Sequence, residues 1–239
     1  MNIYESLPFS EVVAGNSYPG RGILLGKTPD GKKAAIAYFI MGRSENSRNR
    51  IFTEKDGQVT IYPFDESKLC DPSLVIYSPV RTIGDYLIVT NGDQTDTIYD
   101  HLAADKTFEQ ALETRCFEPD GPNFTPRISG LIRFKGRDFT YKLSILKSAD
   151  AAGTACSRFT FSYPALPGTG HFIRTYNCDG APIPTFTGEP VRVKMGGDLD
   201  GFTNMVWSSL NEENRVSLYT RFVDLTTGTF ESRIINKNQ

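Results

Sequence analysis

The sequence predicts an α+β fold in which two sheets stack on each other and helices lie outside them. Most of the 239 residues fall into short apolar runs that pair around turn residues, whereas few segments repeat apolar residues at helical spacing. Sequential hairpins with helices between them are typical of α+β proteins. Hydrophobic residues make up 39% and charged residues 23%, which is typical of a globular protein, so we expect one domain over residues 1–239.

Most of the expected strands pair across recognisable turns. The stretch 28–31 (Thr-Pro-Asp-Gly) separates the first pair, and Asp56-Gly57 is a dipeptide that tight hairpins prefer. Lys135-Gly136 and Thr227-Gly228 mark two later turns. The expected strands are 22–26 with 33–41, 50–54 with 58–63, 74–79, 86–90, 127–134 with 139–146, and 216–223 with 229–235.

Helical spacing occurs in fewer segments. In one of them, Thr107 and Gln110 stand three positions apart before an apolar run, as in a capping box. In the longest, four apolar residues share one face of the helix. The expected helices are 95–104, 107–116 and 198–210, with a short one within 4–13.

Charge and hydropathy exclude several classes of function. A net charge of −2 excludes a general nucleic-acid binder, and no run approaches the ~18 apolar residues of a membrane span. Residues 1–6 lack the basic start and apolar stretch of a signal peptide, so we expect a cytoplasmic protein. In that compartment we expect buried free thiols rather than disulfides at the four cysteines, Cys70, Cys116, Cys156 and Cys178.

Common cofactor motifs are absent from the sequence. The stretch 26–28 (Gly-Lys-Thr) resembles the end of a phosphate-binding P-loop, but Arg21 stands where that motif needs glycine. His101 and His171 are the two histidines of the chain, and neither belongs to a metal-binding motif. We therefore expect no metal and no cofactor, and acid–base chemistry that depends mainly on carboxylates, tyrosine, cysteine or lysine.

The segment 42–50 (G-R-S-E-N-S-R-N-R) has the richest binding chemistry. It lies between two expected strands, so we expect a loop. Its three arginines offer forked donors that hold a phosphate bidentately, and serine and asparagine add short hydrogen-bonding groups. A solvated connection would more often contain lysine, glutamate and glycine. The segment therefore predicts an anion site suited to a small phosphorylated metabolite.

Two further segments concentrate polar groups beside expected strands. Residues 91–98 (N-G-D-Q-T-D-T-I) follow a strand and open a helix, so Thr95 or Asp93 as the helix N-cap is a structural explanation. Residues 118–128 contain three prolines and end with Arg127 entering a strand. Each segment alone is equally compatible with a structural and a functional role.

Taken together, the segments G-R-S-E-N-S-R-N-R, N-G-D-Q-T-D-T-I and N-F-T-P-R-I-S, in this order, resemble the archaeal-type IMP cyclohydrolase family and its bacterial relatives. Residues 18–22 and 185–190 are similar to the bacterial branch, and the resemblance runs over residues 16–223. Three linked motifs are far more specific than any one of them.

The resemblance implies a four-layer αββα fold, mostly antiparallel and related to the N-terminal nucleophile hydrolases. It also implies a cofactor-free cyclohydrolase that closes the purine ring of 5-formamidoimidazole-4-carboxamide ribotide to IMP and water. The partner is then a small phosphorylated purine nucleotide, and a homo-oligomer is compatible with the family. Because both reacting groups belong to one molecule, holding them in a near-attack geometry supplies much of the acceleration.

Roles in this reaction can be assigned to residues of the three segments and to two outside them. We expect Arg43, Arg48 and Arg50 to anchor the phosphate, and Tyr77 and Glu118 to handle protons. A core tyrosine and a solvated loop acid remain the alternatives for the last two. The expected catalytic residues are Tyr77, Glu118 and Arg48, and the expected substrate-binding residues are Arg21, Arg43, Ser44, Asn49, Arg50, Asn91, Thr95, Asp96 and Arg127.

Two other functions stay open at this point. A non-catalytic purine-nucleotide sensor is one, because Gln94 stands where archaeal members tend to carry histidine. An amidohydrolase acting on another carbon–nitrogen bond is the second. The N-terminal nucleophile mechanism is disfavoured for it, because removal of Met1 would expose Asn2, which is no such nucleophile.

Overall fold

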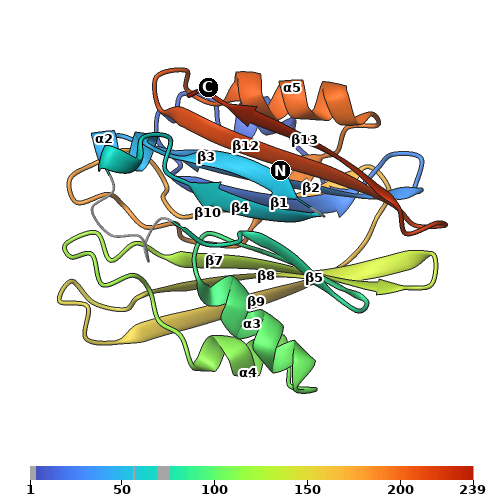
Figure 1. Ribbon diagram of the computed structural model, residues 1–239, viewed down its shortest axis with the longest axis horizontal. Coiled ribbons are helices and arrows are strands. Elements are labelled where there is room, and N and C mark those ends of the chain that lie inside the picture. The colour runs from blue at the N-terminus through green and yellow to red at the C-terminus, as the bar shows by residue number, and fades with distance from the viewer. Residues whose placement is uncertain (1–3, 56, 69–75, 239) are drawn as a thin grey trace.

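A computed structural model describes residues 4–55, 57–68 and 76–238. In this part of the chain two antiparallel sheets, one of six and one of seven strands, face each other (Figure 1). The predicted α+β class is confirmed.

The first sheet has the strand order β11-β10-β1-β2-β12-β13. Two of its central strands, β2 and β12, are buried on both faces, which explains the continuous apolar run of β2. The predicted hairpins β1–β2 and β12–β13 are both present. The strands are β1 (Arg21–Lys27), β2 (Lys33–Met41), β10 (Thr169–Arg174), β11 (Val191–Lys194), β12 (Arg215–Asp224) and β13 (Phe230–Asn236).

The second sheet runs in simple sequence order from β3 to β9. Its hairpins β3–β4 and β7–β8 agree with the predicted pairs, although Asp56 of the first turn lies outside the described residues. The strands are β3 (Ile51–Lys55), β4 (Gln58–Tyr62), β5 (Val80–Ile83), β6 (Tyr86–Thr90), β7 (Arg127–Lys135), β8 (Asp138–Ser148) and β9 (Cys156–Pro164).

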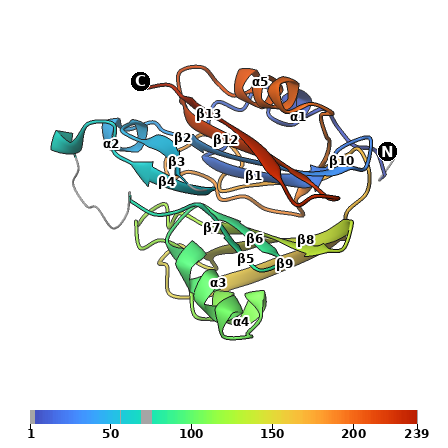
Figure 2. The same cartoon turned by 45° about the vertical axis from the view of Figure 1, so that its right-hand side comes forward.

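Helices cover the outer faces of both sheets (Figures 1 and 2). Helices α1 (Phe9–Val12) and α5 (Leu199–Ser209) pack on the first sheet. Helices α3 (Gln94–Ala103) and α4 (Phe108–Glu113) pack on the second. The largest apolar core lies between the sheets and draws on strands from β1 to β12.

The helix ends largely follow the predicted caps. The Thr107 side chain accepts from the Gln110 N–H at 3.2 Å, and Gln110 Oε1 accepts from the Thr107 N–H at 2.9 Å, so the predicted capping box is confirmed. Asp93 occupies the N-cap position of α3, but its side chain makes no capping hydrogen bond. That aspartate is available for other contacts, described below.

Three expectations need correction. Residues 76–79 are not a strand, and β5 begins only at Val80, because Ile76 is 40% exposed and Pro79 has no N–H to donate; residues 74 and 75 lie outside the described part. The loop 42–50 contains one helical turn, α2 (Glu45–Arg48), because Ser44 and Ser47 cap its start reciprocally. A 3₁₀ turn, η1 (Glu66–Lys68), follows β4. Strands β9, β10 and β11 lie in a stretch for which the sequence predicts no element.

The third correction concerns the cysteines. Cys116, Cys156 and Cys178 are free thiols, as expected, but Cys116 and Cys178 are exposed rather than buried, and Cys70 lies outside the described residues. None of the described helices combines the length and the apolar character that crossing a bilayer requires.

Candidate active site

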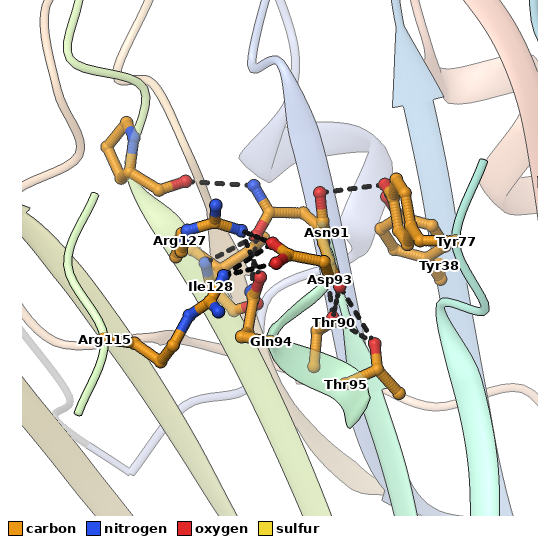
Figure 3. A network of polar contacts seen from close by, with 12 residues as sticks. Tyr38, Tyr77, Thr90, Asn91, Asp93, Gln94, Thr95, Arg115, Arg127 and Ile128 are labelled. Atoms are coloured by element: carbon orange, nitrogen blue, oxygen red, sulfur yellow. Dashed lines mark hydrogen bonds and ion pairs between the residues drawn. The ribbon is translucent and has the colours of Figure 1, made fainter. Parts of the chain in front are cut away.

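Two tyrosine hydroxyls and a backbone carbonyl form a row of polar contacts that joins the two sheets (Figure 3). The hydroxyl of Tyr38, on β2, lies 3.0 Å from that of Tyr77, which precedes β5. Tyr77 in turn donates to the Asn91 carbonyl, directly after β6, at 2.8 Å. Tyr38 is fully buried and Tyr77 is 7% exposed, so burial raises the pKa of both phenols.

Three charged side chains surround these tyrosines. Arg21, at the start of β1, and Arg50, just before β3, both interact electrostatically with Tyr77 and with Glu118. Arg21 stands two positions before Ile23 on β1, so both side chains lie on the same face of the strand. Ile23 belongs to the core between the sheets, and Arg21 therefore points between the sheets as well. We call Arg21, Tyr38, Arg50, Tyr77 and Glu118 the inner cluster.

The charges of the inner cluster lack close partners. Within the described residues, neither the Arg21 nor the Arg50 guanidinium donates a hydrogen bond to the protein, and the buried Arg50 Nε has no partner. Among the same residues the Glu118 carboxylate forms no ion pair, and only its backbone N–H bonds, to the Thr125 carbonyl. Because a buried charge or donor without a partner is costly, this arrangement is suited to a ligand that supplies the missing contacts.

The pKa values of these groups follow from burial and from one another. Burial raises the pKa of Glu118, and Arg21 and Arg127 only partly oppose that effect. Burial and the neighbouring positive charge of Arg21 both lower the pKa of Arg50. The pKa of Arg21 is raised despite burial, because Tyr18 and Glu118 lie around it. A carboxyl group whose pKa is raised, with tyrosine hydroxyls in its electrostatic surroundings, is a candidate for proton transfer.

Asn91 is held by bonds to the backbone of the segment that leads into β7. Its Nδ2 donates to the Pro126 carbonyl at 2.9 Å, and its Oδ1 accepts from the Ile128 N–H at 2.8 Å. Gln94 Nε2 donates to the same Oδ1 at 3.0 Å. The Asn91 side chain therefore joins two segments, and the Asn91 backbone carbonyl positions the Tyr77 hydroxyl.

Arg127, the first residue of β7, is fixed by two neighbours (Figure 3). Its Nη1 lies 2.7 Å from Gln94 Oε1 and 2.7 Å from Asp93 Oδ1. Asp93 also accepts two bonds of 2.6 Å from Arg115. Burial raises the pKa of Asp93, but the two arginines outweigh it and hold that pKa below the ordinary value.

The arginine-rich segment reaches the inner cluster through Arg50. Arg43 instead pairs with Asp179 and lies 5.0 Å over the ring of Tyr18. Arg48 donates from Nε to the Gly42 carbonyl at 3.0 Å and from Nη2 to Asn214 Oδ1 at 3.0 Å. The three predicted phosphate anchors therefore do not converge on one point in this structure.

Four other predicted site residues make local structural contacts. Ser44 caps α2, and Asn49 exchanges two hydrogen bonds with the backbone of Asp65. The buried Thr95 hydroxyl lies 2.6 Å from the Thr90 hydroxyl and donates to the Gly92 carbonyl. The Asp96 side chain, 59% exposed, pairs with Arg81 at 2.6 Å. In the described structure none of the four side chains contacts the inner cluster.

Several residues of this region escape prediction from the sequence. Tyr38 stands in a continuous apolar run, where nothing distinguishes it from a core residue. Arg115 follows a helix and carries no motif. Tyr18 and Tyr176 stack at 5.8 Å, and both contribute to the electrostatic surroundings of Arg21. Of these, Tyr18 had a signal, because it opens the stretch 18–22 of the family resemblance.

The donor set of the site contains carboxylates, tyrosines and arginines. Within the described ranges no three His, Cys, Asp or Glu side chains gather as a metal site would require. Guanidinium groups and hydroxyls are suited to hold anionic and amide oxygens, whereas a divalent metal needs several oxygen, nitrogen or sulfur ligands.

Between the two stacked antiparallel sheets lie a carboxyl group, two phenols and two arginines whose guanidiniums donate no hydrogen bond to the described residues, which is an arrangement suited to binding a small anion. The chain belongs to a family described as IMP cyclohydrolase-like protein, whose profile matches residues 18–228.

Curated archaeal proteins named IMP cyclohydrolase are similar to this chain. The protein of Methanopyrus kandleri is 35% identical over 116 residues, which cover 47% of this chain and 57% of the relative. That of Methanococcus aeolicus is 30% identical over 165 residues, covering 67% and 75%. That of Natronomonas pharaonis is 32% identical over 120 residues, covering 48% and 58%. The chain spans little more than half the length of most of these relatives.

Proposed function

We propose that this protein is an IMP cyclohydrolase that closes the purine ring of 5-formamidoimidazole-4-carboxamide ribotide to give IMP and water. The observation that carries the proposal is the inner cluster, in which two arginines and a carboxyl group find no hydrogen-bond partner for their charged ends among the described residues and lie beside two buried phenols. The family, and the name that its archaeal members carry, indicate which small anion occupies it.

The reaction requires proton transfer but no redox step. The carboxamide nitrogen attacks the formyl carbon, and the formyl oxygen leaves as water. One hydrogen of that water comes from the carboxamide nitrogen and the other from the formamide nitrogen. Because the attack is intramolecular, holding the substrate in a reactive conformation supplies much of the rate. A positioned acid or base adds about 10²–10⁴-fold.

Glu118 and Tyr77 are the groups that we assign to these protons. Glu118 has a raised pKa, so it can donate to the departing oxygen and accept from the amide in the same cycle. Tyr77 donates to the Asn91 carbonyl in the free protein and lies beside Tyr38, so the two hydroxyls form a short relay. Arg127 interacts electrostatically with Glu118, and we assign it, together with Asn91, to orienting the substrate.

Arg21 and Arg50 are the cations that we assign to the negative charge of the nucleotide. Both guanidiniums are free of protein hydrogen bonds among the described residues, so a ligand can use their full fork of donors. We place Arg43 at the rim beside Tyr18. We assign Arg48, Ser44 and Asn49 to the shape of their loop, and Thr95 and Asp96 to the start of α3.

Three broader features belong to the same proposal. The order of helices, sheet, sheet and helices supports a relationship to the αββα fold of the N-terminal nucleophile hydrolases. A core between the sheets that draws on strands from β1 to β12 supports a single domain. A cytoplasmic location, a homo-oligomeric state and a reaction without a cofactor complete the proposal.

The purified protein, the formamido substrate and the absorbance of IMP test this proposal. We expect substrate-dependent formation of IMP that Glu118→Gln slows strongly. Binding of IMP without turnover would identify a nucleotide sensor instead. Release of formate from the substrate, or hydrolysis of linear amides without IMP, would identify an amidohydrolase.

A further inference from the structure

Gln94 connects the groups that lie around the inner cluster. It is fully buried at the first position of α3. Its Oε1 accepts from Arg127 Nη1 at 2.7 Å, and its Nε2 donates to Asn91 Oδ1 at 3.0 Å and to the Ile128 carbonyl at 3.2 Å (Figure 3). One amide therefore connects the arginine that interacts electrostatically with Glu118 and the asparagine whose backbone carbonyl accepts from the Tyr77 hydroxyl.

The chemistry of its neighbours determines which way this amide points. Arg127 can only donate, so the amide oxygen must face it. The Asn91 amide is oriented by its Oδ1, which accepts from the Ile128 N–H, and by its Nδ2, which donates to the Pro126 carbonyl. The two atoms that face Gln94 Nε2 are therefore Asn91 Oδ1 and the Ile128 carbonyl oxygen, and both are acceptors. The site thus needs one acceptor and one donor on the same side chain, which an amide provides and a carboxylate does not.

The residues before Gln94 also lie close to the Arg127 guanidinium. A Cβ on Gly92 would lie 2.4 Å from Arg127 Nη1 and 2.6 Å from Gln94 Oε1, so both side chains lie directly over that glycine. Asp93 holds the same guanidinium by an ion pair. Gly92, Asp93 and Gln94 therefore act as one cradle for Arg127.

We propose that Gln94 is a positioning residue for ring closure, which holds the Arg127 guanidinium toward Glu118 and fixes Asn91 so that its carbonyl orients the Tyr77 hydroxyl. This inference rests on the proposed function. The amide then has a role in turnover that does not depend on contact with the substrate. Its oxygen holds Arg127, and its nitrogen holds Asn91.

The variant Gln94→Glu separates this role from a general structural one. A protonated carboxyl group has one acceptor oxygen and one O–H donor, so it reproduces the bond from Arg127 and one of the two bonds that the amide nitrogen donates. An ionised carboxylate has acceptors only, and it would face Asn91 Oδ1 and the Ile128 carbonyl without a donor. The variant should therefore regain activity as the pH falls through the pKa of the new carboxyl group.

The experiment measures kcat and KM between pH 5 and pH 8.5, with each variant expressed as a ratio to wild type at the same pH. At pH 8 we expect Gln94→Glu to lose about 10- to 100-fold in kcat with KM changed less than about threefold, the cost of a small misplacement of reacting groups. The kcat ratio should then rise about tenfold or more toward pH 5, because the new carboxyl group becomes protonated over that range.

Two further variants serve as controls. Gln94→Met has a similar shape and no titratable group, so its kcat ratio should be low and independent of pH. Gln58→Glu makes the same chemical change at an exposed glutamine bonded to Ser78, outside the site, and its ratio should stay near one. Far-ultraviolet circular dichroism at each pH confirms that all three variants are folded.

The outcomes distinguish the inference from the function on which it rests. Wild-type protein that forms no IMP overturns the proposed function, and the positioning role falls with it. If the wild-type protein forms IMP, the positioning role alone is overturned by either of two results. One is a kcat ratio of Gln94→Glu to wild type that does not change with pH, and the other is a Gln94→Met variant as active as wild type.

Discussion

Replacing Arg50 by methionine should make the free protein more stable and make it a weaker binder of nucleotide. The guanidinium of Arg50 faces the positive charge of Arg21, and its buried Nε has no hydrogen-bond partner among the described residues. Methionine keeps an unbranched apolar stem of similar length but removes the charge and the orphan donor. A residue retained for ligand binding is expected to show this opposition between stability and function.

The size of both effects follows from the contacts. An unsatisfied buried donor costs about 1–3 kcal/mol, so its removal should raise the free energy of unfolding by about 1–2 kcal/mol after some loss of attraction to Glu118. In a chain of this length that corresponds to a rise in Tm of about 2–8 °C. A charge-assisted bond to the ligand is worth about 1.5–3 kcal/mol, so the Kd for IMP should rise about 10- to 150-fold.

Thermal unfolding without ligand and titration calorimetry with IMP measure the two quantities. Arg48→Met is the matched control, because the Arg48 guanidinium already donates to the Gly42 carbonyl and to Asn214. We expect that control to lower Tm and to leave the Kd unchanged. An Arg50→Met protein that is less stable than wild type and binds IMP equally well would refute the assignment of Arg50 to the ligand.

Three further predictions concern the same region. Glu118→Gln should lower kcat by about 10²–10⁴-fold with little change in the Kd for IMP, as steady-state kinetics and calorimetry will show; an unchanged kcat would remove Glu118 from proton transfer. Gly92→Ala should lower the unfolding free energy by about 1–3 kcal/mol, measured in urea, because the new Cβ would displace Arg127; wild-type stability and turnover would contradict that packing. Asp93→Asn should be less stable than wild type at pH 7. Burial raises the pKa of Asp93, but Arg115 and Arg127 hold that pKa below its ordinary value in the folded protein. The stability that the ionised Asp93 contributes is therefore fully present above the pKa that Asp93 has in the unfolded chain, and it is lost as the pH falls through the pKa in the folded protein. The difference in unfolding free energy should therefore shrink below about pH 4, and a gap that stays constant down to pH 2 would contradict the linkage.

Local patterns were sufficient for most of the elements. The turn at 28–31 and the capping box at Thr107 and Gln110 specify backbone geometry within a few residues, and the structure has the hairpin and the helix that they predict. Strand β9 escaped prediction, as did β10 and β11. The run 74–79 looked like a buried strand, although Ile76 is exposed and the Tyr77 side chain points into the site.

For the site, the sequence by itself indicated the chemistry and the family, through three ordered segments rich in arginine, amide and hydroxyl groups. Five residues of the candidate site were among the predicted ones, and electrostatic interactions and one hydrogen bond connect them in the structure: Arg50, Glu118, Tyr77, Asn91 and Arg127. Which of the arginines face the ligand could not be decided from the sequence, because Arg43, Arg48 and Arg50 are equivalent as donors.

Our assignment of Arg21 and Arg50 to the ligand rests on the tertiary structure. Arg21 begins a strand of one sheet and Arg50 precedes a strand of the other, so the two guanidiniums meet only when the sheets stack. Tyr38 reaches Tyr77 for the same reason. Local propensities act over a few residues, whereas the packing of one sheet face on another determines which side chains, distant in the sequence, become neighbours between the sheets. The sequence alone therefore determined most of the elements and the family, and the stacking of the sheets brought together the residues to which we assign the ligand.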